Sequence, residues 1–329
     1  VMYREKTKEG EIYGGPMYVI KNGLPKRMLP LAYFFALAGM IGCLPAFQSN
    51  QLIQITGDLA FSEIENFNIF GGLALAGITG IVVIGGLKRI AEVATFLVPL
   101  MGSIYFGAML IALILKFDQV LPAFKLILVD AFNGTAIAGG TFFGVLIYGI
   151  RRGAFSNEAG MGTESLVHGV AKVSDPVKQG LVAMTGPIFD TLIICTATAL
   201  MILVSGVWET SSSQGVTLTA EAFSMLLGNF GGFILFICVI CFGLSTIFTY
   251  SYYGASCTRF LFGKFGMKFY IYLYIFSIFI YSIVPIDVAI NIADGAFAMM
   301  AIPTLVSALW LAPKVMQASK NYFKLIDNY

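Results

Sequence analysis

Long apolar runs separated by short polar stretches dominate the pattern of hydrophobic and polar positions along this chain. A helix needs about 20 apolar residues to cross a bilayer, and runs of this order lie at residues 30–55, 67–87, 91–115, 134–154, 181–207, 231–256, 269–285 and 288–312. Prolines inside three of these runs are compatible with membrane helices, because neighbouring helices can satisfy the carbonyl groups that a kink frees. The pattern therefore predicts an all-α, polytopic membrane protein with about eight transmembrane helices.

The polar stretches outside these runs divide the chain into three parts. We expect a cytoplasmic N-terminal arm at residues 1–28, one transmembrane domain at residues 29–313 and a cytoplasmic tail at residues 314–329. Because the chain begins with Val1 and opens on a charged arm, we expect it to be truncated at its N-terminus. Residues 120–133 carry apolar and polar groups at helical spacing, which predicts an interfacial or re-entrant helix.

The distribution of charge gives the expected orientation. The chain is 58% hydrophobic and only 12% charged, with a mean hydropathy of +0.84. All but two of its 20 lysines and arginines, Lys116 and Lys125, fall on one side of the predicted membrane. The positive-inside rule assigns that side to the cytoplasm. We therefore expect a multi-pass protein of the cell membrane with both ends of the chain in the cytoplasm and the lipid bilayer as its surroundings.

Several other classes of protein have no support in the sequence. No basic cluster suggests nucleic acid, and the five cysteines show neither metal-ligand spacing nor a disulfide framework. The motifs HExxH, GxSxG and GxGxxG and the Walker A motif are missing from the printed sequence. The sequence therefore predicts a protein that is not an enzyme and that carries no organic cofactor.

The segment Gly149–Gly162, GIRRGAFSNEAGMG, gathers charged and polar groups directly after an apolar run. Such groups are expensive in a membrane unless they face protein, water or a substrate. The charge count puts this segment at the cytoplasmic face, which predicts an inner gate formed by Arg151, Arg152, Phe155, Ser156, Asn157 and Glu158. A basic loop with polar helix caps would explain the same residues.

Two predicted spans carry features that suit a ligand site. Gly139 and Gly140 weaken the fourth helix and favour an unwound, ligand-facing backbone, with Phe143 and Ile147 following on one helical face. In the sixth span, one face carries Gly243, Thr246, Tyr250 and Tyr253 and is flanked by Ser245. Hydroxyl oxygens on such a face suit Na⁺ or an ammonium group, although hydrogen bonding between helices explains them equally.

Four consecutive polar residues, Gln48 to Gln51, occupy the outer half of the first run, where they face either the bundle interior or the interface. Asp190 and Asp294 are acidic groups inside predicted spans and are functional candidates for the same reason. His168, the only histidine, has no partner at metal spacing and is expected to be a polar loop residue.

Several longer motifs give the chain a family resemblance. They are GGPMYVI at residues 14–20, FQSNQ at 47–51, RRGAFSNEAGMGTES at 151–165, QGLVAMTGPIFDTLIICTATALMILVSGVW at 179–208 and STIFTYSYYG at 245–254. Through these motifs the chain resembles the alanine/glycine:cation symporter family, which includes the sodium:alanine symporters. The likeness covers essentially the whole chain.

The resemblance implies a leucine-transporter-like fold of two inverted repeats, in which the eight spans would be core helices three to ten. It implies Na⁺-coupled transport of alanine or glycine by alternating access. Matching positions imply a substrate site at Gln48, Gly139, Gly140, Phe143, Ile147, Thr246 and Tyr250, and sodium ligands at Ser245 and Thr246. Tyr250 stands where the family commonly has tryptophan, and together with Phe143 it would leave space only for a small side chain.

The sequence leaves alternatives open for the substrate and for the coupling ion. The substrate could be glycine, D-alanine or glutamine, and the coupling ion could be H⁺, with Asp190 or Glu158 as the proton carrier. A membrane scaffold without transport activity is the alternative from another class, but polar groups inside several spans argue against it.

Overall fold

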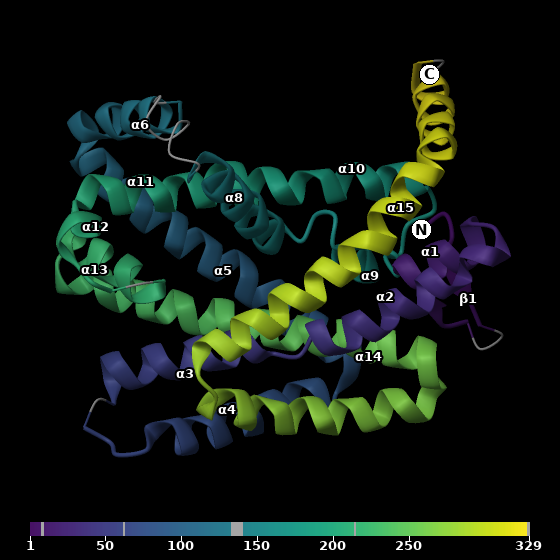
Figure 1. The fold of residues 1–329 in the computed structure, drawn as a ribbon, viewed down its shortest axis with the longest axis horizontal. Helices are drawn as coiled ribbons and strands as arrows, with labels where there is room; N and C mark the ends of the chain where they lie inside the picture. Colours follow the sequence, from purple (N-terminus) through teal and green to yellow (C-terminus); the bar gives the residue numbers. More distant parts are fainter. Residues whose placement is uncertain (8–9, 62, 133–140, 214, 328–329) are drawn as a thin grey trace. The chain divides into compact units, whose positions relative to one another are not determined.

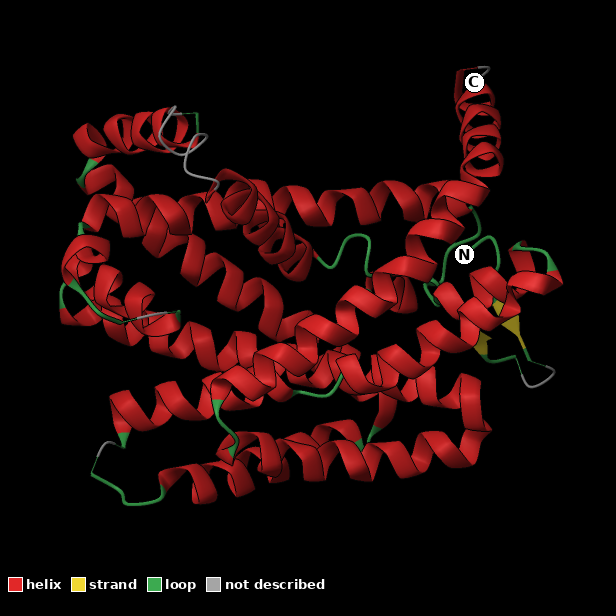
Figure 2. Ribbon diagram, in the orientation of Figure 1, coloured by secondary structure: helices red, strands yellow, loops and turns green. Residues whose placement is uncertain are grey.

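The structure is a computed structural model that describes residues 1–329 except 8–9, 62, 133–140, 214 and 328–329. Helices make up most of the described chain, and two short antiparallel strands, β1 (Glu5–Lys6) and β2 (Ile12–Tyr13), pair in the N-terminal arm (Figure 2). The prediction of an all-α protein is thus confirmed.

The chain forms two compact units. Unit 1 comprises Val1–Phe47, Asn157–Pro187 and Thr249–Tyr329, and unit 2 comprises Gln48–Ser156 and Ile188–Phe248. Figure 1 identifies each helix by its label and its position along the chain. Each unit is described by itself below.

The first three predicted runs fold as helices with somewhat different ends. The run at 30–55 follows α1 (Pro16–Gly23) and the short η1 (Lys26–Met28), and it forms α2 and α3, which are separated by a turn at residues 43–45 that ends in a proline. The bounds are Leu29–Gly42 for α2, Ala46–Ala60 for α3, Phe67–Val83 for α4 and Gly86–Leu115 for α5. The predicted helix at 120–133 is present as α6 (Phe117–Ala131).

In the middle of the chain, the described part of the fourth run is α8 (Thr141–Asn157), followed by α9 (Glu164–His168). The fifth run is α10 (Pro176–Pro187), then a π-helix η2 (Ile188–Cys195), then α11 (Thr196–Ser205). Two helices that the apolar pattern did not predict, α12 (Val207–Thr210) and α13 (Val216–Leu227), follow it.

The sixth and seventh runs form one long element, α14 (Asn229–Ile283), interrupted at Gly263. Gly263 has φ 71° and ψ −163°, a combination that only glycine adopts readily, so the chain turns back there without a longer loop. The last run is α15 (Ile286–Asp327), which extends beyond the predicted end at residue 312.

Five helical segments are long and apolar enough to cross a membrane: Lys26–Asp58, Gly86–Leu115, Pro176–Ser205, Asn229–Ile283 and Ile286–Ile326. Shorter helices such as α4 are also apolar, and large side chains on α4, including Phe70 and Ile81, are exposed. A soluble domain would bury such surfaces, whereas lipid covers them in a membrane. The chain is therefore a multi-pass membrane protein, and the count of eight spans stays a prediction.

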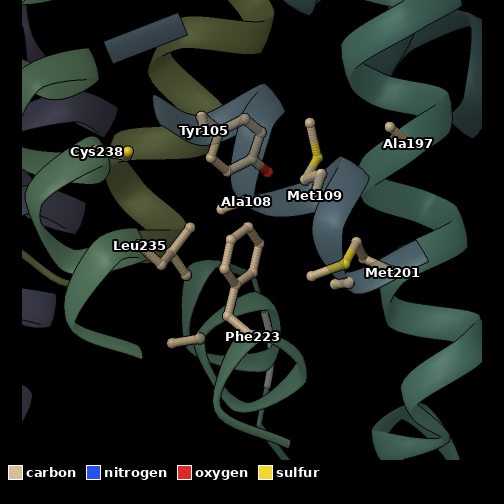
Figure 3. Packing of buried hydrophobic residues seen from close by; sticks show 10 residues of the cluster. Tyr105, Ala108, Met109, Ala197, Met201, Phe223, Leu235 and Cys238 are labelled. Carbon is tan, nitrogen blue, oxygen red and sulfur yellow. The ribbon is translucent and has the colours of Figure 1, made fainter. Parts of the chain in front are cut away.

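An apolar cluster forms the core of unit 2 (Figure 3). Tyr105 and Met109 of α5 meet Met201 of α11 and Phe223 of α13 in this cluster. The rings of Tyr105 and Phe223 stack with centroids 5.5 Å apart, and the Tyr105 hydroxyl lies 2.9 Å from Oγ1 of Thr198. The phenol thus keeps a polar partner inside an apolar core, as buried tyrosines usually do.

Helix α2 packs along α15 and against α1 in unit 1. Glycines allow the close approach: a Cβ atom at Gly39 would lie 2.7 Å from Sγ of Cys257, and one at Gly42 would lie 2.9 Å from Cβ of Ala296. Small residues at such contacts increase van der Waals packing where apolar burial gives little driving force.

Candidate functional site

The segment Gly149–Gly162 comprises the end of α8 and the loop that follows. On α8, Phe143 and Ile147 share one face and are 69% and 54% exposed. Gly139 and Gly140, predicted to unwind the helix before them, lie outside the described residues. The assignment of these four residues to a substrate site therefore stays a prediction.

The arginines at the end of α8 lie among aromatic rings. The Arg152 guanidinium is 5.5 Å from the ring centroid of Tyr148 and 5.6 Å from that of Phe155, which are cation–π distances. Arg151 is exposed. Five of the six predicted gate residues, all except Glu158, thus belong to the last turns of α8 rather than to a loop.

Ser156 connects the end of α8 to the π-helix within unit 2. Its hydroxyl donates a hydrogen bond of 2.7 Å to Oδ2 of Asp190, which also accepts one of 3.1 Å from Thr191. Asp190, singled out from the sequence as an acidic group inside a span, is therefore satisfied by two hydroxyls. π-Helical turns are rare and often occur at functional sites, and η2 carries this carboxylate.

Glu158 follows α8 with φ 55°, in the left-handed region that residues other than glycine rarely occupy. Its carboxylate accepts hydrogen bonds from the Tyr250 and Tyr253 hydroxyls, two groups on successive turns of α14. The Thr163 hydroxyl faces the same carboxylate but is fully buried and makes no hydrogen bond of ordinary geometry. Burial raises the pKa of the Glu158 carboxyl, and the neighbouring hydroxyls offset part of that effect.

Tyr250, predicted as a substrate contact, and Glu158, predicted as a gate residue, therefore meet in unit 1. Tyr250 is 3% exposed, and its ring packs against those of Tyr253 and Phe297. The preceding gate residue, Asn157, caps the loop, since its Oδ1 accepts the Ala159 backbone N–H at 2.9 Å.

Two sequence motifs far apart in the chain pack directly on each other in unit 1. A Cβ atom at Gly14 would lie 2.5 Å from Cα of Gly169, and one at Gly162 would lie 2.6 Å from Cγ of Pro16. Gly162 also has φ 89°. The GGPMYVI motif thus lies against the turn that carries MGTES. Sequence reasoning quoted both motifs as family identifiers but did not predict this contact, and the glycines in each were the available signal.

Ser245 and Thr246, the predicted sodium ligands, lie on α14 within unit 2. Ser245 is 7% exposed and donates to the carbonyl oxygen of Phe242 at 2.9 Å. Gly243 lies one turn before Thr246 on α14, and a Cβ atom at Gly243 would lie 3.3 Å from the Leu52 side chain of α3.

Gln48 lies one helical turn before Leu52 on α3, and Thr246 lies one turn after Gly243 on α14. The two predicted substrate contacts are therefore on the helix faces through which α3 and α14 approach each other. Asp294 is half-buried on α15. At the end of α9, Nδ1 of His168 lies 2.6 Å from Nε2 of Gln179, a residue of α10.

These features define a class: a multi-pass helical membrane protein whose polar side chains gather around a few interrupted helices, as in transporters. A profile of the sodium:alanine symporter family matches residues 1–328. The chain belongs to this family, whose members are transporters and not enzymes.

Individual relatives agree with this assignment. An uncharacterized transporter of Bacillus subtilis, YflA, is 36% identical over 98% of this chain and 69% of its own length. The sodium/alanine symporter AgcS of Methanococcus maripaludis is 33% identical over 100% of this chain and 73% of its own length. A probable sodium/glutamine symporter of Bacillus subtilis, GlnT, is 32% identical over 98% of this chain and 66% of its own length.

Proposed function

We propose that the protein is a secondary active transporter that couples Na⁺ movement to symport of a small neutral amino acid, alanine or glycine, by alternating access. Family membership over residues 1–328 is the observation that carries this proposal. AgcS matches the whole chain, and its name, sodium/alanine symporter, supports Na⁺ as the coupling ion and alanine as the substrate.

The proposed architecture is the leucine-transporter-like inverted repeat, with core helices three to ten in this chain. The broken path of several helices supports it, because discontinuous helices form the ion and substrate sites of such transporters. One break inside a predicted span occurs at residues 43–45, and in another span η2 replaces α-helical turns by π-helical ones. The side with nearly all lysines and arginines would face the cytoplasm of a cell whose plasma membrane holds the protein.

In this proposal, the substrate contacts are Gln48, Gly139, Gly140, Phe143, Ile147, Thr246 and Tyr250, and Na⁺ binds at Ser245 and Thr246. The approach of α3 and α14 at Gly243 and Leu52 supports a shared position for Gln48 and Thr246. Hydroxyl oxygens are suitable ligands for Na⁺, a hard cation.

The proposed inner gate comprises Arg151, Arg152, Phe155, Ser156, Asn157 and Glu158. The hydrogen bond between Tyr250 and Glu158 supports a direct connection between the substrate site and this gate. A ligand that moved the Tyr250 ring would change the contacts of the gate carboxylate, which is the differential interaction that alternating access requires.

Uptake of radiolabelled amino acids into proteoliposomes tests the proposal. We expect alanine uptake down an inward Na⁺ gradient and little uptake when K⁺ replaces Na⁺. Glycine, D-alanine and glutamine, added as unlabelled competitors, determine the substrate range. Uptake that ignores Na⁺ and follows a pH gradient would refute sodium coupling.

Thr246→Ala tests the assigned site. The substitution removes the hydroxyl and should abolish Na⁺-dependent alanine uptake at unchanged protein amount. Thr95→Ala is the matched control, because the Thr95 hydroxyl is exposed on α5 and donates only to the carbonyl oxygen of Ala91. Unchanged uptake by Thr246→Ala with the same Na⁺ dependence would contradict the assignment.

A further inference from the structure

A carboxylate and three hydroxyls converge in unit 1 at the position of Glu158. The hydroxyls of Tyr250 and Tyr253 come from one face of α14, three residues apart, and that of Thr163 comes from the loop before α9. Tyr250, Tyr253 and Thr163 are 3%, 6% and 0% exposed, so their hydroxyls belong to the protein interior.

The charge of this carboxylate has no ionic counterpart among the residues that the structure describes. No lysine, arginine or histidine there forms an ion pair with Glu158, and its charged or titratable neighbours are Glu164 of α9, Cys43 at the end of α2 and the two tyrosines. None of these carries a positive charge. Glu158 is only partly exposed, and a carboxylate that has lost contact with water without gaining a cation is unfavourable unless a proton or a metal ion neutralises it.

The Thr163 hydroxyl gives independent evidence for a ligand. It is fully buried, it faces the carboxylate, and it makes no hydrogen bond of ordinary geometry. Buried polar groups are nearly always satisfied in native proteins, so an unsatisfied one indicates a missing partner.

We propose that Glu158, Tyr250, Tyr253 and Thr163 form a binding site for a small monovalent cation, Na⁺ or H⁺, separate from the hydroxyls of Ser245 and Thr246. The proposal rests on the proposed function in that a bound cation would act on the gate of a cation-coupled transporter. Carboxylate and hydroxyl oxygens are hard ligands suited to Na⁺, and the same carboxylate can take a proton instead.

The backbone at Glu158 supports a functional reason for this side chain. The position directly after a helix end with positive φ is usually glycine or asparagine, yet glutamate occupies it with φ 55°. Residues held in sparsely populated conformations cluster at functional sites, where the surrounding structure maintains them.

Cation binding to the purified protein in detergent, without amino acid, tests the proposal. Na⁺ is titrated by calorimetry at fixed pH, and proton uptake is followed with an indicator dye as the pH is lowered. We expect Glu158→Gln to weaken Na⁺ binding at least about tenfold, or to remove one proton that the wild type takes up above the pH range of exposed carboxylates, because either cation depends on the negative charge. The control Glu92→Gln, at a carboxylate exposed on α5 beside Lys88, should match the wild type in Na⁺ binding.

Three further substitutions keep the test valid if Glu158→Gln does not fold. Tyr253→Phe and Thr163→Val remove one hydroxyl each at nearly constant volume, and each should weaken Na⁺ binding by a factor of about ten or less. If the ligand is a proton, each should instead raise the pH at which the carboxyl titrates, because each hydroxyl stabilises the charged form. Glu158→Asp keeps the charge and should retain measurable binding of the same cation.

The outcomes separate this proposal from the proposed function. Loss of Na⁺ binding in Glu158→Gln identifies Na⁺ as the ligand, and loss of the titrating proton with unchanged Na⁺ binding identifies H⁺. Both measurements equal to wild type in Glu158→Gln and Thr163→Val would overturn the site. Because these assays contain no amino acid, a wild-type protein that fails to transport alanine would contradict the proposed function without affecting them.

Discussion

Different kinds of internal contact stand out in unit 1 and in unit 2. In unit 1, backbone segments meet through glycines, as at Gly14 and Gly169, and the arm is fixed by Arg4, whose guanidinium donates to the carbonyl oxygens of Ala171 and Val173. In unit 2, large apolar side chains such as Tyr105 and Phe223 fill the centre. The comparison teaches that glycine contacts specify the packing of the GGPMYVI motif in unit 1, whereas the cluster around Phe223 in unit 2 depends on apolar volume.

The largest effect should come from removing volume in unit 2. Phe223 is fully buried in the apolar cluster, so Phe223→Ala should lower the free energy of unfolding by about 3–5 kcal/mol, because it leaves a cavity. Thermal unfolding in detergent measures this loss of stability. The control is Phe233→Ala on α14, where the side chain is 58% exposed, and equal losses in the two variants would contradict this role of the cluster.

The next effect should come from adding a single methyl group in unit 1. Gly14→Ala places Cβ 2.5 Å from a backbone atom that has no rotamer to change, so we expect a loss of about 1–3 kcal/mol. Gly77→Ala on α4 is the matched control, since no atom lies within 4 Å of its added Cβ. Alanine favours helix over glycine, so the control should be neutral or stabilising in the same unfolding assay.

A smaller effect should follow loss of the hydrogen bond between Ser156 and Asp190. Ser156→Ala should cost about 0.5–1.5 kcal/mol, the usual net contribution of one hydrogen bond. Asp190→Asn tests the pairing through a double-mutant cycle, in which the combined loss should fall short of the sum of the single losses. Additive losses would show that the two groups do not interact.

The smallest effect belongs to the arm of unit 1. The Glu11 carboxylate accepts a hydrogen bond from Tyr13 and pairs with Arg259 at 3.0 Å, and these two contacts lower its pKa below the usual 4.5. A lowered pKa gives stability that is present above the ordinary value and lost as the pH falls through the lowered one. The melting temperature of Glu11→Gln should therefore lie slightly below that of the wild type near neutral pH, and the difference should shrink below pH ~4.5. A difference independent of pH would contradict the ionic contribution.

Apolar periodicity predicted the membrane class and most helix positions, because long apolar runs have few other uses in a folded protein. The pattern could not predict α13, since residues 216–227 are too short and too mixed to resemble a span. It also could not predict the turn at Gly263, which depends on one backbone conformation rather than on hydropathy.

The candidate site was predicted as residue types but not as contacts. Glu158 and Tyr250 were both named from motifs, yet nothing in the sequence paired them, because residues 92 positions apart meet only through tertiary packing. Thr163 and Tyr253 were likewise not predicted as partners of Glu158. The burial of an unsatisfied hydroxyl is a property of the folded chain and has no signature in composition or spacing.

The left-handed backbone at Glu158 sets a limit for protein engineering. Glycine would relieve the unfavourable conformation at φ 55°, but it would leave the buried hydroxyls of Tyr250 and Tyr253 without their acceptor. A selection for thermal stability alone should therefore favour Glu158→Gly together with Tyr250→Phe and Tyr253→Phe, and the resulting protein should be insensitive to the cation. Stability and cation response are opposed at this residue, so variants selected for structural work need a cation-binding assay beside the melting curve.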